Sequence, residues 1–137
     1  MRVNQVAKLL NVTPDTIRFY TRNRILQPSK SESTGYRDYS EKEVNRLRFV
    51  LSARQLGFSV ADIKQILAEA VDKKSPCLTV RRLIDQRLYE TEERFAEMVD
   101  LRNRMKHAVL EWSDKPDQAP TADMICHLIE GFSFSPK

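Results

Sequence analysis

The sequence VNQVAKLLNVTPDTIRFYTRNRIL, residues 3–26, predicts two short helices joined by a tight turn. Apolar residues recur at helical spacing through the first helix, which we expect to end at Asn11, a residue that tolerates the left-handed conformation. Thr13 and Pro14 then supply a helix N-cap and a proline at the first helical position, where its missing N–H costs nothing. The second helix carries several basic residues, Arg18 among them. The pattern is typical of a helix-turn-helix whose second helix enters a DNA groove, although helical hairpins without a DNA role are also common.

The next stretch, QPSKSESTGYRDYS at residues 27–40, predicts a small hairpin, or wing. A proline, several hydroxyl residues and a glycine mark a turn, and Tyr36 and Tyr39 flank it with side chains that favour strands. Lys30 and Arg37 should lie near its tip and base.

Two further helices are expected after the wing. Ser40 and Glu43 predict a capping box at the start of the third helix, which should end at Gly57. Ser59 and Asp62 predict a cap for the fourth helix. The apolar stripes of both helices indicate the core of the front domain.

Composition and charge limit the classes of protein that the chain can belong to. It has 137 residues, 41% of them apolar and 31% charged, which suits a helical folded chain. No apolar run approaches the roughly 18 residues of a membrane span, and no signal peptide pattern is present, so we expect a cytoplasmic protein. Residues 1–76 hold 14 Lys/Arg against 8 Asp/Glu, whereas residues 77–137 hold 9 against 11. A basic front half suggests contact with a polyanion.

No proline or glycine interrupts residues 77–115, which predicts one long helix. A heptad seam fits it with seven of nine positions apolar. Its positions are Ile84, Leu88, Thr91, Phe95, Met98, Arg102, Met105, Val109 and Trp112. A helix of about 50 Å cannot bury that edge against so short a chain, so we expect a homodimer. The alternative is a helix folded back on its own domain.

Three motifs together resemble the mercury-resistance-regulator (MerR) family of transcription factors. They are the helix pair at residues 3–26, TGYRDYS at residues 34–40 and ARQLGFSVADIKQIL at residues 53–67, in family order and spacing. The resemblance implies a mainly α fold in three parts. These are a winged helix-turn-helix DNA-binding domain at 1–72, a hinge and a dimerisation helix that forms an antiparallel coiled coil at 73–113, and a short effector (metal)-binding loop and tail at 114–137.

The resemblance also implies which residues meet DNA. The recognition helix would enter the major groove of a near-palindromic promoter, and the wing would lie on the backbone. The expected DNA-binding residues are Thr16, Arg18, Tyr20, Lys30, Tyr36, Arg37 and Arg54. RNA polymerase is an implied partner, since the family activates transcription by bending and untwisting promoter DNA.

Antiparallel helices would place Cys77 of one subunit beside the tail of the other. The stretch PCLTVRRLIDQRL, residues 76–88, resembles the zinc-, cadmium- and lead-responsive members, and Cys126, His127 and the residues after them resemble their metal loop. Thiolate and imidazole suit zinc, cadmium, lead or mercury. Cys77, Cys126 and His127 are therefore the expected metal ligands.

The chain departs from that branch because it lacks a cysteine at the start of the loop. A loop aspartate is an alternative to His127 for completing the site. A thiol redox or electrophile switch, or a small-molecule response, remains open as another kind of sensing. An enzyme is not expected, because the sequence holds no phosphate-binding glycine loop, no nucleophile and base set and no metal-hydrolase motif.

Overall fold

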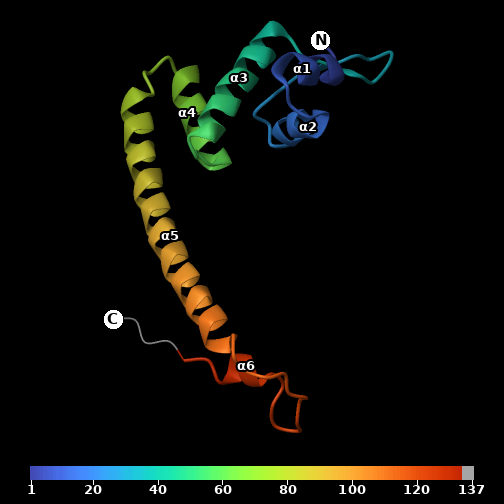
Figure 1. Ribbon diagram of the computed structural model, residues 1–137. Coiled ribbons are helices and arrows are strands. Elements are labelled where there is room, and N and C mark those ends of the chain that lie inside the picture. The colour runs from blue at the N-terminus through green and yellow to red at the C-terminus, as the bar shows by residue number, and fades with distance from the viewer. Residues whose placement is uncertain (134–137) are drawn as a thin grey trace. The chain divides into compact units, whose positions relative to one another are not determined.

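The computed structural model describes residues 1–133, which are mainly helical (Figure 1). The chain divides into two compact units, Met1–Arg87 and Leu88–Lys137. The last four residues of the predicted tail lie outside the described part. Among the described residues, no helix is long and apolar enough to cross a membrane.

The front unit opens with the predicted helix-turn-helix. Helix α1 spans Val3–Leu10 and helix α2 spans Pro14–Arg22. Asn11 between them adopts the left-handed conformation, at φ 56° and ψ 47°, as predicted. The hydroxyl of Thr13 accepts a hydrogen bond from the backbone N–H of Thr16, which confirms the predicted cap.

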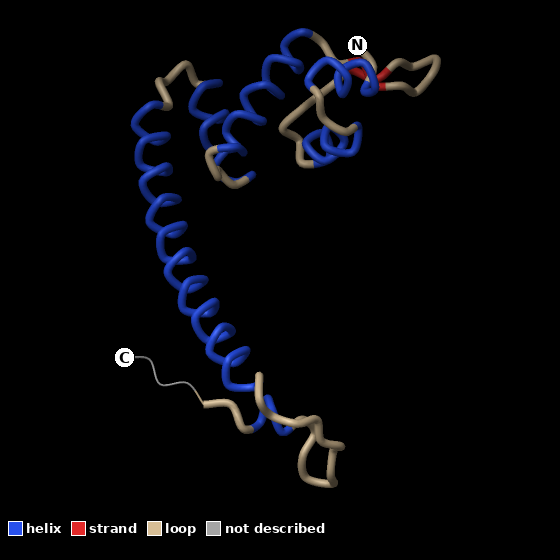
Figure 2. The backbone as a smooth tube through the Cα atoms, viewed as in Figure 1, coloured by secondary structure: helices blue, strands red, loops and turns tan. Residues whose placement is uncertain are grey.

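The wing is a two-stranded antiparallel hairpin. Strand β1 spans Ser29–Lys30 and strand β2 spans Arg37–Asp38, with Lys30 opposite Arg37 (Figure 2). Gly35 closes the turn at φ 75°, a conformation that side chains with a Cβ rarely adopt. The predicted hairpin is confirmed.

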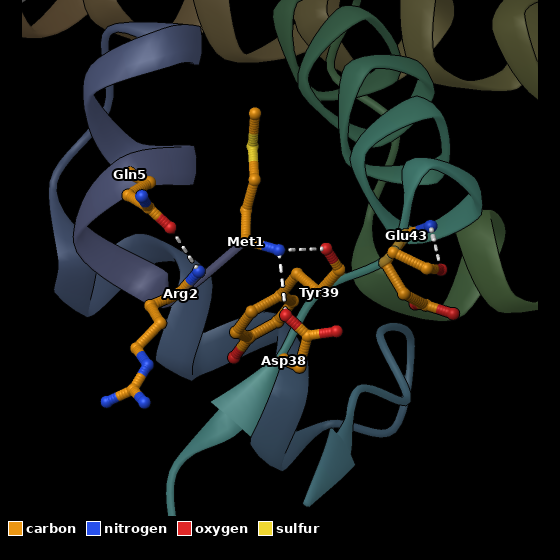
Figure 3. A network of polar contacts seen from close by, with 7 residues as sticks. Met1, Arg2, Gln5, Asp38, Tyr39 and Glu43 are labelled. Carbon is orange, nitrogen blue, oxygen red and sulfur yellow. Dashed lines mark hydrogen bonds and ion pairs between the residues drawn. The ribbon is translucent and has the colours of Figure 1, made fainter.

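Residue 1 extends this hairpin on the side of β2. The amino nitrogen of Met1 donates to Asp38 Oδ1 at 2.8 Å and to the carbonyl oxygen of Tyr39 at 2.9 Å (Figure 3). The backbone N–H of Tyr39 donates back to the carbonyl of Met1 at 2.6 Å. The segment before α1 is therefore fixed to the base of the wing.

Helix α3 spans Glu41–Gln55 and helix α4 spans Val60–Val71. Gly57, at φ 88°, lies in the turn between them, where the sequence predicted a stop. The predicted capping box of α4 is present, because Ser59 and Asp62 exchange hydrogen bonds between side chain and backbone.

The predicted capping box of α3 was half wrong. The hydroxyl of Ser40 accepts from the N–H of Glu43, as expected. The carboxylate of Glu43 does not return to Ser40; it is buried and accepts a hydrogen bond from the backbone N–H of Gln27 at 2.9 Å. A tertiary contact with the segment that leads into the wing has replaced the local one.

One apolar core holds the front unit together. Its fully buried large side chains come from both helices of the helix-turn-helix, the segment after them, the wing and helices α3 and α4. They are Val6, Ile17, Ile25, Leu26, Tyr39, Leu47, Val50 and Ile63. Burial of these apolar side chains away from water is the main source of the stability of the front unit.

Helix α5 spans Cys77–Trp112, and helix α6, which the sequence did not predict, spans His127–Glu130. The first turns of α5 belong to the front unit. Leu83 is buried in the core, and Thr79 Oγ1 donates to Glu69 Oε1 at 2.7 Å.

An ion pair between α4 and α5 adds to these contacts. Arg87 Nε lies 2.9 Å from Asp62 Oδ2, and Arg87 Nη2 donates to Asp62 Oδ1 at 3.3 Å. Burial of Asp62 opposes its ionisation, but the hydrogen bonds from Ser59 and the guanidinium of Arg87 outweigh it and lower the pKa of Asp62 below 3.8. The carboxylate is therefore stabilised in its charged form.

Replacing Asp62 should destabilise the front unit, because Asp62→Asn removes the charge that pairs with the half-buried Arg87. We expect a loss of about 2 kcal/mol in the free energy of unfolding at pH 7, measured by urea at fixed protein concentration. Since the folded pKa is lowered, the contribution of Asp62 is present above its ordinary pKa of 3.8 and is lost as the pH falls through the folded value. The difference between wild type and Asp62→Asn should therefore shrink below pH 3.8.

Asp85→Asn is the matched control, because Asp85 is an exposed carboxylate on α5. Equal stability losses in the two variants, or a difference that does not change with pH, would contradict the role given to the ion pair.

Candidate DNA interface and effector site

The predicted recognition residues of α2 differ in how far they are exposed to solvent. Arg18 is exposed, and its guanidinium lies 3.0 Å from the exposed carboxylate of Asp15. Such a surface pair contributes little and can be exchanged for a DNA contact. Thr16 is half-buried, and its hydroxyl shares a hydrogen bond of 2.9 Å with the hydroxyl of Thr13. Thr16 therefore also stabilises the start of the helix.

Tyr20 was expected near the DNA groove, but it does not lie on the outward face of α2. Its side chain is only 5% exposed and belongs to the core of the front unit. The reason is helical spacing, because Tyr20 follows the fully buried Ile17 by three residues and shares its inward face. The same spacing in the sequence could have shown this.

The wing residues lie together with Arg18 around one hollow of about 560 Å³. Arg18 comes from α2, Lys30 from β1, Tyr36 from the wing turn and Arg37 from β2. None of the residues that line the hollow is acidic. The hollow therefore concentrates positive charge on the face that carries the recognition helix.

Two lining residues were missed by the sequence analysis. Arg2 and Asn4 reach the same hollow from the start of α1, and the guanidinium carbon of Arg2 lies 4.2 Å from the centre of the Tyr36 ring. No sequence signal indicated them, because their position depends on the pairing of Met1 with Tyr39.

Arg54 does not line the hollow. Its guanidinium donates to the carbonyl oxygen of Phe58 at 3.1 Å and so supports the turn between α3 and α4. The side chain is still exposed, so this bond leaves donors free for a phosphate.

The two cysteines are free thiols near the starts of helices. Cys77 is exposed and is the first residue of α5, where its backbone N–H donates to Ser75 Oγ at 3.4 Å. Cys126 is half-buried and is the N-cap residue of α6.

Hydrogen bonds order the loop around Cys126. Glu130 Oε2 accepts from the backbone N–H groups of Ile125 and Cys126, at 3.0 and 2.7 Å. His127 Nε2 lies 2.9 Å from the carbonyl oxygen of Pro116. Because a carbonyl only accepts, Nε2 carries a proton in this contact, and in the neutral ring Nδ1 keeps the lone pair that a metal would need.

Within residues 1–133 of one chain, no three His, Cys, Asp or Glu side chains gather as a group that could hold a metal ion. The predicted ligands therefore do not form a complete site in a single subunit.

The predicted seam of α5 is open in a single chain. Leu88, Phe95, Met98, Met105 and Val109 are each more than half exposed. Trp112 is an exception, because it is partly covered and its indole N–H donates to the carbonyl oxygen of Leu128 at 3.0 Å. An exposed apolar stripe of this length is typical of a surface that another protein chain covers.

A helix-turn-helix, a hairpin wing and a shared basic hollow define a winged helix-turn-helix DNA-binding protein. Comparison with known proteins agrees. Residues 1–70 match the family described as "MerR HTH family regulatory protein", and residues 44–108 match the family described as "MerR, DNA binding".

Relatives cover most of the chain. The HTH-type transcriptional regulator ZntR of Escherichia coli (strain K12) is 34% identical over 106 residues, which are 77% of this chain and 75% of that protein. The regulator HmrR of Rhizobium leguminosarum bv. viciae is 32% identical over 119 residues, which are 85% and 92% of the two chains. The crystal structure of PbrR691 from Ralstonia metallidurans CH34 in complex with lead(II) has the same fold, with a TM-score of 0.71, 20% identity and coverage of 96% and 99%.

The chain belongs to the MerR family of helix-turn-helix regulatory proteins. Regulators of this family bind promoter DNA as homodimers and work with RNA polymerase, and they are not enzymes.

Replacing Arg18 should weaken DNA binding without unfolding the protein, because its side chain is exposed on the recognition helix. We expect Arg18→Ala to cost about 1–3 kcal/mol on a site selected from random duplexes, measured by fluorescence anisotropy. Arg82→Ala removes an exposed arginine of α5 and should bind as wild type does. Equal affinities of wild type and Arg18→Ala would show that α2 does not contact DNA through Arg18.

Proposed function

We propose that this protein is a cytoplasmic transcription activator that responds to a soft divalent metal ion. The observation that carries the proposal is the pair of free thiols at the starts of α5 and α6. The PbrR691 structure is a complex with lead(II), and a further relative is the heavy metal-dependent transcription regulator 2 of Rhizobium meliloti (strain 1021). These relatives support a metal as the effector here, and they leave its identity open.

Cys77 of one subunit and Cys126 of the other would hold the ion. In an antiparallel pair of α5 helices, the start of one helix lies beside the end of the other, which leads into the loop with Cys126. The open apolar stripe on α5 supports such a pair. The donor set fits a soft ion, because two thiolates can hold one in linear geometry and His127 Nδ1 or a loop aspartate can add a ligand. Tetrahedral zinc would need two ligands beyond the thiolates.

Glu130 is a poor candidate ligand although it lies close to Cys126. Its carboxylate oxygen already accepts two backbone hydrogen bonds that shape the loop. The exposed loop aspartates Asp114, Asp117 and Asp123 are better placed to complete the site, since all three are accessible.

The contacts of α5 with α4 would carry the signal to the DNA-binding domain. Thr79, two residues after Cys77, bonds to Glu69, and Arg87 pairs with Asp62. An ion that draws Cys77 toward the partner's loop would move the start of α5 and, through these contacts, α4. Two dimer geometries would then differ in how they bend and untwist promoter DNA, and the ion would favour one of them.

Removing both thiols should abolish tight metal uptake and leave DNA binding intact. We expect reduced wild type to bind at least one ion among zinc, cadmium, lead, mercury and copper(I) far more tightly than a Cys77→Ser, Cys126→Ser double variant, measured by competition with a chelator. Uptake of every ion to the same weak extent by both proteins would reject metal sensing. Duplex binding that survives in the double variant would leave the DNA function standing.

Subunit mixing tests whether the site is shared between subunits. A heterodimer of Cys77→Ser and Cys126→Ser chains keeps one intact pair, formed by Cys77 of one chain and Cys126 of the other. Random exchange should therefore restore about a quarter of the wild-type tight sites, although neither single variant has any. No recovery after verified exchange would contradict a site between subunits.

A thiol switch is the second candidate, because Cys77 is exposed and both cysteines are free. Its mark would be an intersubunit disulfide under mild oxidation, seen on a non-reducing gel, that changes promoter binding in the absence of any metal.

A further inference from the structure

The hollow beside the recognition helix is lined by a positively charged side chain, Arg2, that is not among the predicted DNA-binding residues. Arg2 reaches it from the segment before α1, and its guanidinium lies over the ring of Tyr36 at 4.2 Å. Tyr36 is 59% exposed, so its ring is not part of the core. The ring therefore has a free face on which a guanidinium can stack.

The backbone fixes Arg2 at this place. The N–H of Arg2 donates to Gln5 Oε1 at 2.8 Å (Figure 3). The carbonyl of Arg2 accepts from the N–H groups of Gln5 and Val6. Met1, the residue before Arg2, donates from its amino nitrogen to the carbonyl of Tyr39 and accepts at its own carbonyl from the N–H of Tyr39. The side chain thus starts from a rigid position, which lowers the entropy lost when its head binds a ligand.

The charges around the hollow are unbalanced. Arg2, Arg18, Lys30 and Arg37 contribute four cations to its lining, and no acidic residue lines it. Asp38, the nearest acid in sequence, gives its carboxylate to the nitrogen of Met1. Within the described residues, no carboxylate is paired with Arg2, Lys30 or Arg37 in an ion pair.

We propose that Arg2, held over the ring of Tyr36, binds a backbone phosphate of duplex DNA in this hollow. The inference rests on duplex binding by the helix-turn-helix and adds the N-terminal segment to that interface. A guanidinium that lies over a ring can still present its planar N–H edge, and that edge matches phosphate oxygens in a bidentate contact. A phosphate contact supplies affinity and register but does not read sequence.

Salt dependence of DNA binding measures the contact directly. The probe is a fluorescein-labelled duplex of about 30 base pairs with arbitrary sequence, titrated between about 50 and 200 mM KCl. We expect Arg2→Gln to weaken binding about 5- to 10-fold and to reduce the slope of log K against log salt by about 0.9, the value for one lost phosphate contact. Lys64→Gln removes a single exposed charge from α4 and should change neither value.

A double-mutant cycle tests the role of Tyr36. Tyr36→Leu removes the aromatic face and Tyr36→Phe keeps it. We expect Arg2→Gln to cost several-fold less in the Tyr36→Leu background than in wild type, and its full cost in Tyr36→Phe. Thermal unfolding should be unchanged in each variant, since both side chains are exposed.

Three results would overturn the proposal. An unchanged affinity and salt slope for Arg2→Gln, while wild type binds duplex, would reject the phosphate contact and leave the DNA function intact. A loss confined to a selected promoter site would instead assign Arg2 to base reading. Failure of wild type to bind any duplex at the lowest salt would reject both the inference and the proposed function.

Discussion

The ion pair between Asp62 and Arg87 is the contact through which, in the proposed mechanism, helix α5 would act on the DNA-binding core. It joins α4, a helix of the DNA-binding core, to the third turn of the helix that begins at Cys77. The pair is mostly shielded from water, and Ser59 holds the same carboxylate through the cap of α4. A shift of α5 would therefore act on the start of α4 itself, where Ser59 and Asp62 form the helix cap. The hydrogen bond from Thr79 to Glu69 and the buried side chain of Leu83 hold the start of α5 on the same front unit. The segment between α4 and α5, residues 72–76, contains no regular structure, so these contacts and the ion pair would carry a shift of α5 to α4.

Local signals in the sequence were sufficient for most of the fold. Asn11, Thr13, Gly57 and the Ser59–Asp62 box each act within a few residues, so their sequence positions predicted the helix boundaries correctly. Errors arose where a distant partner decides the outcome. The carboxylate of Glu43 binds the backbone of Gln27 and not the predicted cap. Helix α6 depends on hydrogen bonds to Glu130, which a short apolar run in the sequence does not predict.

The candidate DNA interface shows the same division. The sequence predicted three of the cations, because they stand on a recognisable helix and wing: Arg18, Lys30 and Arg37. It did not predict Arg2, because Arg2 reaches the hollow only through the pairing of Met1 with Tyr39. Tyr20 was expected near the DNA groove because it stands on the predicted recognition helix. Its spacing from Ile17 indicated the core instead, and its side chain is buried there.

Two features of the single chain are incomplete, and a second copy of the chain would complete both. Its apolar seam on α5 is exposed, and its thiols form no metal group within residues 1–133. A second copy crossing head to tail would cover the seam and would bring a thiol to each loop in the same step. Metal affinity and dimer stability would then be linked, because an ion that binds only across subunits favours the associated state by mass action. In such a dimer the contacts of α5 with α4 would move each front unit as a whole, because its core is complete without the partner, and the effector would thereby change the spacing of the two recognition helices.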